Sequence, residues 1–152
     1  MNILIVCTGN TCRSPMAEGL LKKIADNDDS VHVLSGGLFA NAGEPVSENA
    51  ARAMAERGID ISAHTAKNIH AAVVQEADLI LTMTQAHEDL ILRMFGVEAA
   101  DKTYTLLEYI GEEGDVVDPF GQDLEHYRQC AAMLNDALQK VYDKIRSENG
   151  GV

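Results

Sequence analysis

The chain has 152 residues, of which 46% are hydrophobic and 24% charged, and this composition predicts one globular domain over residues 1–152. Its formal net charge of −12 disfavours nucleic acid as a partner, so any bound anion must be held by local donors. No apolar run approaches the ~20 residues of a membrane span, and no signal peptide opens the chain. We therefore expect a cytoplasmic protein without membrane contact, present as a monomer.

The hydrophobic pattern predicts strands and helices that alternate along the chain. Short apolar runs predict strands over residues 2–6, 32–35, 77–83 and 102–104. Apolar residues spaced by three and four predict helices over residues 14–25, 47–57, 85–95 and 123–147. Ser14 is expected to cap the first helix, with Pro15 in its first turn. This alternation is typical of an α/β fold whose parallel sheet is covered on both faces, and such folds bind ligands at the carboxyl ends of the strands.

The segment CTGNTCRS, residues 7–14, lies at such an end. The N–H groups of a loop between a strand and a helix have no internal partner, so they can surround an anion at the positive end of the helix dipole. Gly9 lets the backbone approach a ligand closely, and Asn10 tolerates a left-handed conformation. Arg13 can hold two phosphate oxygens with its planar fork. The segment therefore predicts a site for a phosphate-like dianion.

Cys7 stands where the first strand ends and the first helix approaches. Helix N-termini and nearby cations lower the pKa of cysteine thiols to about 3.5–7.5, so we expect a thiolate aimed at the centre of the anion site. A thiolate there can attack phosphorus directly, and Ser14 can donate a hydrogen bond to the sulfur as it leaves in a second step. A lone cysteine after a strand is more often a small core residue. The polar loop and the helix that follows favour the nucleophile here.

Three segments resemble the low-molecular-weight protein tyrosine phosphatase family. Residues 6–18, VCTGNTCRSPMAE, resemble its active-site loop. Residues 77–87, ADLILTMTQAH, resemble its third strand and the next helix, and residues 118–121, DPFG, resemble its general-acid loop. The resemblance covers essentially the whole chain. It implies a three-layer, doubly wound fold with a four-stranded parallel sheet flanked by helices, and hydrolysis through a phosphocysteine intermediate without metal or cofactor.

The resemblance implies a role for Asp118 as the general acid that protonates the leaving group and later activates water. Asp118 lies in the segment GEEGDVVDPFG, where its glycines permit a mobile loop. By itself, Asp-Pro indicates only the start of a turn, and Asp115 is a weaker competitor for the same role.

The resemblance also assigns residues that bind phosphate or hold the loop in shape. The phosphate-binding loop comprises Thr8, Gly9, Asn10, Thr11, Cys12, Arg13 and Ser14. The supporting hydrogen-bond network comprises Asn10, Ser14, Ser35 and His64. For Ser35 and His64, a capping or surface role is an equal alternative. His87 is expected to be a surface residue of its helix.

The three cysteines predict neither a secreted disulfide framework nor a zinc site, because their number is odd and no zinc-type spacing is present. Cys12 lies inside the loop, five residues from Cys7. We expect it to pair reversibly with an oxidised Cys7, the alternative being a passive small residue. Cys130 is expected only to pack within the last helix.

Thr11 and Phe120 indicate which phosphorylated side chain the enzyme would act on. Many tyrosine phosphatases of this family carry a bulky apolar residue at the position of Thr11 and a pair of tyrosines after the Asp-Pro. Thr11 together with DPFG instead resembles the bacterial protein-arginine phosphatase subgroup. A hydroxyl can bond to a phosphoguanidinium group, Phe120 can stack along that group, and Leu38 with Phe39 can form another wall. We predict phosphoarginine in proteins as the substrate, with phosphotyrosine as the alternative if Thr11 is only a near-isostere.

Two rival functions use the same loop. An arsenate reductase would relay its disulfide to another cysteine near the helix after the third strand, and residues 82–96 contain none. A non-catalytic phosphate-binding module would not need Cys7, Arg13 and Asp118 together. Both rivals are therefore less favoured than a phosphatase that acts on phosphorylated proteins.

Overall fold

The computed structural model describes residues 1–149 and contains a four-stranded parallel sheet in the order β2-β1-β3-β4. Its strands are β1 (Asn2–Cys7), β2 (His32–Gly37), β3 (Leu79–Thr82) and β4 (Thr103–Thr105). Every paired neighbour runs parallel. The predicted α/β fold with its parallel sheet is confirmed, and each predicted strand lies within a few residues of its expected place.

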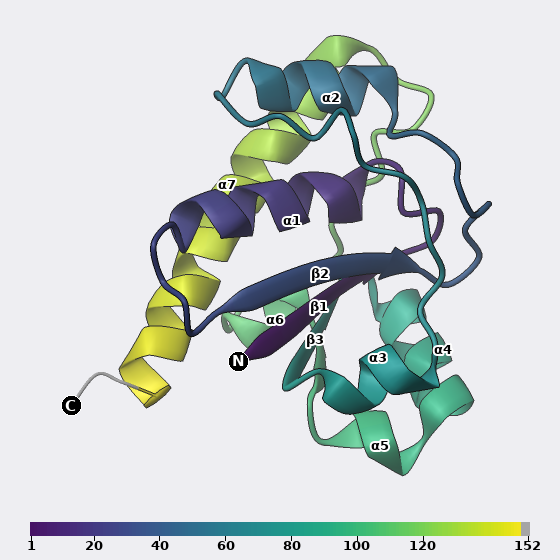
Figure 1. The fold of residues 1–152 in the computed structure, drawn as a ribbon, viewed down its shortest axis with the longest axis vertical. Coiled ribbons are helices and arrows are strands. Elements are labelled where there is room, and N and C mark those ends of the chain that lie inside the picture. The colour runs from purple at the N-terminus through teal and green to yellow at the C-terminus, as the bar shows by residue number, and fades with distance from the viewer. Residues whose placement is uncertain (150–152) are drawn as a thin grey trace.

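Helices cover both faces of the sheet (Figure 1). They are α1 (Arg13–Ile24), α2 (Glu48–Ala55), α3 (Ala71–Glu76), α4 (Gln85–Phe95), α5 (Val97–Ala100), α6 (Leu106–Tyr109) and α7 (Leu124–Asn149). The long α7 packs along α1 and α2 on one face, while α3, α4 and α5 lie on the other. The result is the expected three-layer arrangement.

The alternation of side chains along β1 builds a separate core on each face. Ile3 and Ile5 pack into the cluster shared with α1, α2 and α7. Leu4 and Val6 pack into the cluster shared with α3, α4 and α5. All four side chains are almost fully buried, and burial of each contributes roughly 1.5–3 kcal/mol. A strand buried on both faces has to be apolar throughout, as this one is after Asn2.

Two local features differ from the sequence prediction. The helices α3, α5 and α6 are not predicted, because each has six residues or fewer and so shows no clear period. Ser14 does not cap α1, since the helix begins at Arg13 and Cys12 occupies the N-cap position without a side-chain hydrogen bond. The Ser14 hydroxyl lies inside the first turn and is therefore available to the loop.

The strand order determines where a site can form. From β1 the chain crosses to β2 on one side, and later returns to β3 on the other side of β1. This reversal of direction is a switch point, and open α/β sheets bind ligands at such a point, outside the carboxyl ends of the strands. Thr8, directly after β1, contacts His87, in the first turn of α4, at this place. Among residues 1–149, no helix is long and apolar enough to cross a membrane.

Candidate active site

The Cys7 sulfur lies at the centre of the loop that joins β1 to α1. Cys7 is 3% exposed, and its Sγ accepts the backbone N–H of Asn10 at 3.3 Å. The loop can turn this sharply because Asn10 adopts a left-handed conformation, with φ of 56°, as the sequence predicts. The sulfur therefore sits beneath the loop that leads into the N-terminus of α1, with one backbone N–H directed at it.

A polar side chain also points at the sulfur. Ser14 Oγ lies 2.8 Å from Cys7 Sγ and accepts a hydrogen bond from Asn10 Nδ2 at 2.9 Å. Because the hydroxyl oxygen already accepts the amide, its hydrogen is left to donate to the sulfur. The Ser14 hydroxyl is thus placed to donate a hydrogen bond to the Cys7 sulfur.

Asn10 is the hub of the support beneath the loop. Its side-chain nitrogen also donates to Ser35 Oγ at 3.0 Å, and its side-chain oxygen accepts the backbone N–H of Lys67 at 3.1 Å. Its backbone carbonyl accepts from His64 Nε2 at 2.9 Å. Asn10, Ser14 and Ser35 are fully buried, so these bonds form away from water. The structure brings together all four residues that the sequence assigns to loop support.

Glu18 of α1 completes this network and is not predicted from the sequence. Its carboxylate accepts the Ser35 hydroxyl and the Lys22 ammonium. Burial raises the pKa of Glu18, but the hydrogen bonds from Lys22 and Ser35 outweigh it and hold the pKa below its usual value. An ionised Glu18 fixes Ser35 as a donor toward it, which leaves the Ser35 oxygen to accept the Asn10 amide.

Gly37, at the end of β2, allows the loop to pack against the neighbouring strand. A Cβ atom at this position would lie 2.6 Å from the carbonyl oxygen of Thr8 and 3.3 Å from Asn10 Cβ. The Gly-Gly pair that ends β2 is the sequence signal for this close approach. At Gly9, by contrast, a Cβ would meet only Thr11 Oγ1 at 3.8 Å, so internal packing does not require the glycine expected there.

Arg13 and Asp118 meet at the mouth of the loop. The Arg13 side chain is 7% exposed, donates from Nη1 to the carbonyl of Val116 at 2.9 Å, and places Nη2 3.4 Å from Asp118 Oδ2. The Asp118 side chain is 51% exposed, so it can exchange protons with water. Asp115, the weaker competitor, uses Oδ1 to accept the backbone N–H of Gln85 at the start of α4. Asp118 is thus the carboxylate that faces the loop.

The rim residues differ in how much surface they offer a substrate. Phe39 is 67% exposed and Phe120 is 69% exposed, while Thr11 is half-buried in the loop. Leu38 is 6% exposed and packs into the core cluster of α3 and α4. The prediction of Leu38 as a substrate wall is therefore corrected: the core holds this side chain, and Phe39 alone of the pair is open to a ligand.

Cys12 lies on the α7 side of the loop. It is buried, and its Sγ lies 3.5 Å from the hydroxyl of Tyr127, which also accepts from Ser47 Oγ at 3.2 Å. Burial raises the pKa of Tyr127 to about 12, so its hydroxyl stays protonated. Cys130 is likewise buried, and this burial raises the pKa of its thiol to about 12. Cys130 packs in α7, as expected.

His87 is placed differently from the sequence prediction. It is 6% exposed rather than at the surface, and its Nε2 lies 2.7 Å from Thr8 Oγ1 in the loop. The switch point explains this, because the first turn of α4 starts from the loop after β3 and faces the loop after β1. The sequence signal that could have predicted this burial is that His87 follows the end of a buried strand by five residues. The spacing of apolar residues within the helix does not reveal it.

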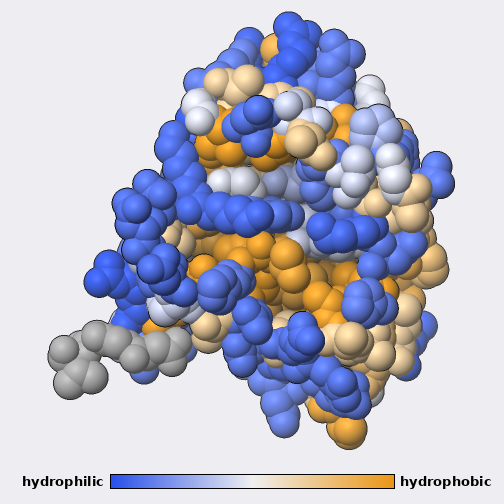
Figure 2. Space-filling view, viewed as in Figure 1, coloured by the Kyte–Doolittle hydropathy of each residue, from blue (hydrophilic) through white to orange (hydrophobic). Residues whose placement is uncertain are grey.

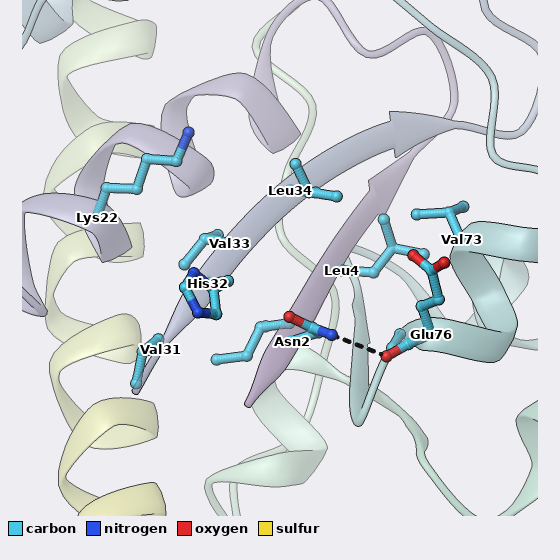
Figure 3. A pocket seen from close by; sticks show the side chains of 11 residues that line it. Asn2, Leu4, Lys22, Val31, His32, Val33, Leu34, Val73 and Glu76 are labelled. Atoms are coloured by element: carbon cyan, nitrogen blue, oxygen red, sulfur yellow. Dashed lines mark hydrogen bonds between the residues drawn. The ribbon is translucent and has the colours of Figure 1, made fainter. Parts of the chain in front are cut away.

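A groove of about 370 Å³ lies at the opposite end of the sheet. Figure 3 shows its walls, with Leu4 from β1, Leu34 from β2 and Val73 from α3, and the hydrogen bond from the Asn2 amide to the Glu76 carbonyl. Figure 2 shows hydrophobic surface over this part of the sheet, bordered by hydrophilic side chains. The groove lies near the amino ends of β1 and β2, so it is separate from the loop at their carboxyl ends.

Comparisons with known proteins agree with this geometry. The family model of low molecular weight phosphotyrosine protein phosphatase matches residues 2–150. The protein-arginine-phosphatase of Bacillus subtilis is 39% identical over 150 residues, covering 97% of this chain and 99% of that protein. The low molecular weight protein-tyrosine-phosphatase PtpB of Staphylococcus haemolyticus is 41% identical over 141 residues, covering 93% of this chain and 97% of that protein.

A solved structure is similar over the same length. The YwlE arginine phosphatase, as a C7S mutant with a phosphorylated active site serine, aligns with a TM-score of 0.93 at 38% sequence identity. The alignment covers 98% of this chain and 98% of that chain. The similarity therefore extends over nearly the whole fold.

Proposed function

The chain belongs to the low molecular weight phosphotyrosine protein phosphatase family, and from this premise we propose that it removes phosphate from phosphoarginine in proteins. The proposal rests on how four side chains are arranged. The Ser14 hydroxyl lies 2.8 Å from the Cys7 sulfur, and Arg13 Nη2 lies 3.4 Å from Asp118 Oδ2 at the mouth of the loop. These groups are a nucleophile with its stabilising donor, an anion-binding guanidinium and an acid.

In the first step the Cys7 thiolate attacks the phosphorus atom, and an S–P bond forms as the bond to the leaving group breaks. The leaving atom takes the proton of Asp118, which becomes a carboxylate. Backbone N–H groups of the loop and the Arg13 guanidinium hold the three phosphoryl oxygens. The buried network under Asn10 keeps these donors in place before the substrate arrives.

In the second step Asp118 accepts a proton from water, and the water oxygen attacks the phosphocysteine. The S–P bond breaks, inorganic phosphate forms, and the thiolate departs with the Ser14 hydroxyl donating to it. Asp118 is reprotonated and Cys7 is again a thiolate, so the enzyme returns to its starting state. In both steps the reacting groups are the side chains of Cys7 and Asp118 and a water molecule, and backbone N–H groups with Arg13 hold the phosphoryl group.

Phosphoarginine is proposed as the substrate from the residues at the rim. Thr11 presents a hydroxyl, which can accept from the N–H groups of a phosphoguanidinium, and a larger apolar residue there could not. Phe120 is exposed and can lie along the planar guanidinium. Two of the similar proteins, from Bacillus subtilis and Geobacillus stearothermophilus, are named protein-arginine-phosphatases. The substrate would thus be a phosphorylated protein.

The test is a side-by-side measurement of kcat/KM on a phosphoarginine peptide and a phosphotyrosine peptide of the same sequence. We expect the wild type to prefer phosphoarginine. A preference for phosphotyrosine would overturn the substrate assignment and leave the phosphatase mechanism in place. In parallel, Cys7→Ser mixed with substrate should accumulate a phosphoryl group on residue 7, detected by peptide mass spectrometry. The Cys130→Ser variant is the matched control and should accumulate none.

A tyrosine phosphatase is the second candidate. It is favoured by the family model and by PtpB of Staphylococcus haemolyticus, which is named a protein-tyrosine-phosphatase and is 41% identical to this chain. Arsenate reduction is disfavoured, because the third cysteine, Cys130, is buried in α7 with its pKa raised to about 12 by desolvation. Reversible pairing of Cys7 with Cys12, a cytoplasmic location and a monomeric state stay predictions.

A further inference from the structure

Thr8, the residue that follows the nucleophile, is held from two sides. Its carbonyl oxygen accepts the backbone N–H of Phe39, at 3.0 Å, from the segment after β2. Its side-chain oxygen lies 2.7 Å from Nε2 of His87, in the first turn of α4. The mechanism above uses Cys7, Ser14, Arg13 and Asp118, and leaves this second contact without a role. A buried histidine beside a phosphate-binding loop requires an explanation.

The protonation of His87 follows from its surroundings. The other ring nitrogen, Nδ1, is buried and has no hydrogen-bond partner among the residues that the structure describes. An N–H group buried without an acceptor is rarer in proteins than an acceptor left without a donor, so the proton belongs on Nε2. Nε2 then donates to Thr8 Oγ1. The Thr8 hydroxyl hydrogen is left free for an acceptor other than His87.

Burial, with the charge of Arg13, keeps the imidazole of His87 neutral. Burial, followed by the positive charge of Arg13, lowers the pKa of His87 to about 4, against smaller opposing effects from Asp115 and Asp118. The positive end of the α4 dipole acts in the same direction as Arg13, because His87 lies in the first turn of that helix. The contact with Thr8 is therefore one between two neutral groups at neutral pH.

We propose that His87 is a positioning residue of the phosphatase site, whose imidazole donates from Nε2 to Thr8 Oγ1 and fixes the part of the loop that directly follows Cys7. The proposal rests on the proposed function, because its consequence is the alignment of the phosphate-binding N–H groups with the attacking sulfur. The inner network holds Asn10 and Ser14 from the side of β2, and His87 holds Thr8 from the side of β3. Hydrogen bonds from both neighbours of β1, on the side of β2 and on the side of β3, thus hold the loop in place.

The first test compares variants that remove or keep the donor. His87→Leu removes it at similar volume, and we expect kcat on p-nitrophenyl phosphate to fall about tenfold, the loss of one buried hydrogen bond. His87→Gln can place an amide N–H near the position of Nε2 and should recover kcat to within about threefold of the wild type. His70→Leu, at an exposed histidine, is the matched control and should leave kcat unchanged. An unchanged kcat in His87→Leu would overturn the proposal.

The second test asks whether His87 acts through Thr8. Thr8→Val keeps the shape of this exposed residue and removes its oxygen, and we expect the same loss as in His87→Leu. The double variant should be no slower than either single variant, because both break one contact. Losses that multiply would mean that His87 acts elsewhere and would overturn the proposal.

A third measurement does not depend on turnover. Bound inorganic phosphate should offset the field of Arg13 and raise the pKa of the His87 imidazole, which NMR can follow by titration with and without phosphate. A pKa that phosphate leaves unchanged would contradict the placement of His87 at the site. If the wild type does not hydrolyse p-nitrophenyl phosphate, the proposed function fails, and phosphate affinity of the same variants becomes the readout for His87.

Discussion

The two sides of the Cys7 loop differ in exposure and in hydrogen bonding. On the inner side, Asn10, Ser14 and Ser35 are fully buried and bonded to one another. On the outer side, Asp118 and Phe120 have more than half of their surface in water. The inner side fixes the geometry of the anion site, while the outer side remains open to exchange protons and to contact different substrates.

The difference in burial predicts different effects of substitution for the buried network residues and for the exposed residues at the mouth of the loop. A buried and fully satisfied polar network loses stability as well as activity when one member is removed, because its partners are left unpaired. An exposed side chain can be changed with little effect on folding. The following predictions test whether this separation holds.

The largest effect is expected for Asp118→Asn. Asp118 is the proposed proton donor, so kcat of this variant on a phosphoarginine peptide should fall roughly 10²–10⁴-fold. The midpoint of urea unfolding should stay the same, because the side chain is half exposed. Asp115→Asn is the control, since Asp115 binds the backbone of Gln85 instead of facing Arg13. A larger loss of kcat in Asp115→Asn would transfer the acid role to that residue.

Gly37→Ala should damage the inner side. The new Cβ would lie 2.6 Å from the Thr8 carbonyl oxygen, which is backbone, so the loop or β2 must shift. We expect a loss of about 1–3 kcal/mol in the free energy of unfolding by urea, with a lower kcat. Gly9→Ala, where the nearest atom is at 3.8 Å, should keep its stability. Equal stability of the two variants would contradict the close approach of β2 to the loop.

Thr11→Ile should change substrate preference rather than folding. The ratio of kcat/KM for phosphoarginine over phosphotyrosine peptides should fall about tenfold or more, because the hydroxyl that we propose to accept from the guanidinium is lost. The measurement uses both peptides with wild type and variant on the same day and at the same salt. An unchanged ratio would mean that Thr11 is not the filter and that selection lies elsewhere on the rim.

The last prediction concerns the pH dependence of stability. The pKa of His87 is lowered to about 4 in the folded chain, mainly by burial, from an ordinary value near 6.5, so the unfolded chain binds more protons between these values. Stability should therefore fall as pH drops from 6.5 toward 4, by at most about 1.4 kcal/mol per pH unit. His87→Gln should show a shallower fall in urea unfolding. Identical pH dependence in both proteins would contradict the lowered pKa.

The order of strands and helices could be predicted because buried strands and long amphipathic helices have clear periods. The sequence also places Cys7, Arg13 and Ser14 in one loop, since they are close in the chain. The short helices α3, α5 and α6 escape prediction because one or two turns show no period. Their positions depend on packing against the sheet.

The errors at the site have one common cause. Leu38 and His87 both follow strand ends, where sequence alone does not tell whether a side chain turns to the core or to the surface. Burial of each follows from the order of the strands, which brings segments from different parts of the chain together. Glu18 is missed for the same reason, because its hydrogen bond with Ser35 forms only once β2 lies beside β1.

The loop near the start of the chain is completed by residues that are synthesised much later. Asn10 bonds to His64, Thr8 to His87, and Cys12 to Tyr127, which is 115 positions further along. Contacts between residues so far apart in the chain form late in folding, because the long chain segment between them must first be closed. A nascent chain therefore carries Cys7 on the ribosome before the contacts that complete its loop can form. We expect activity to begin only after α7 has emerged and docked, so that turnover would report folding from β1 through α7.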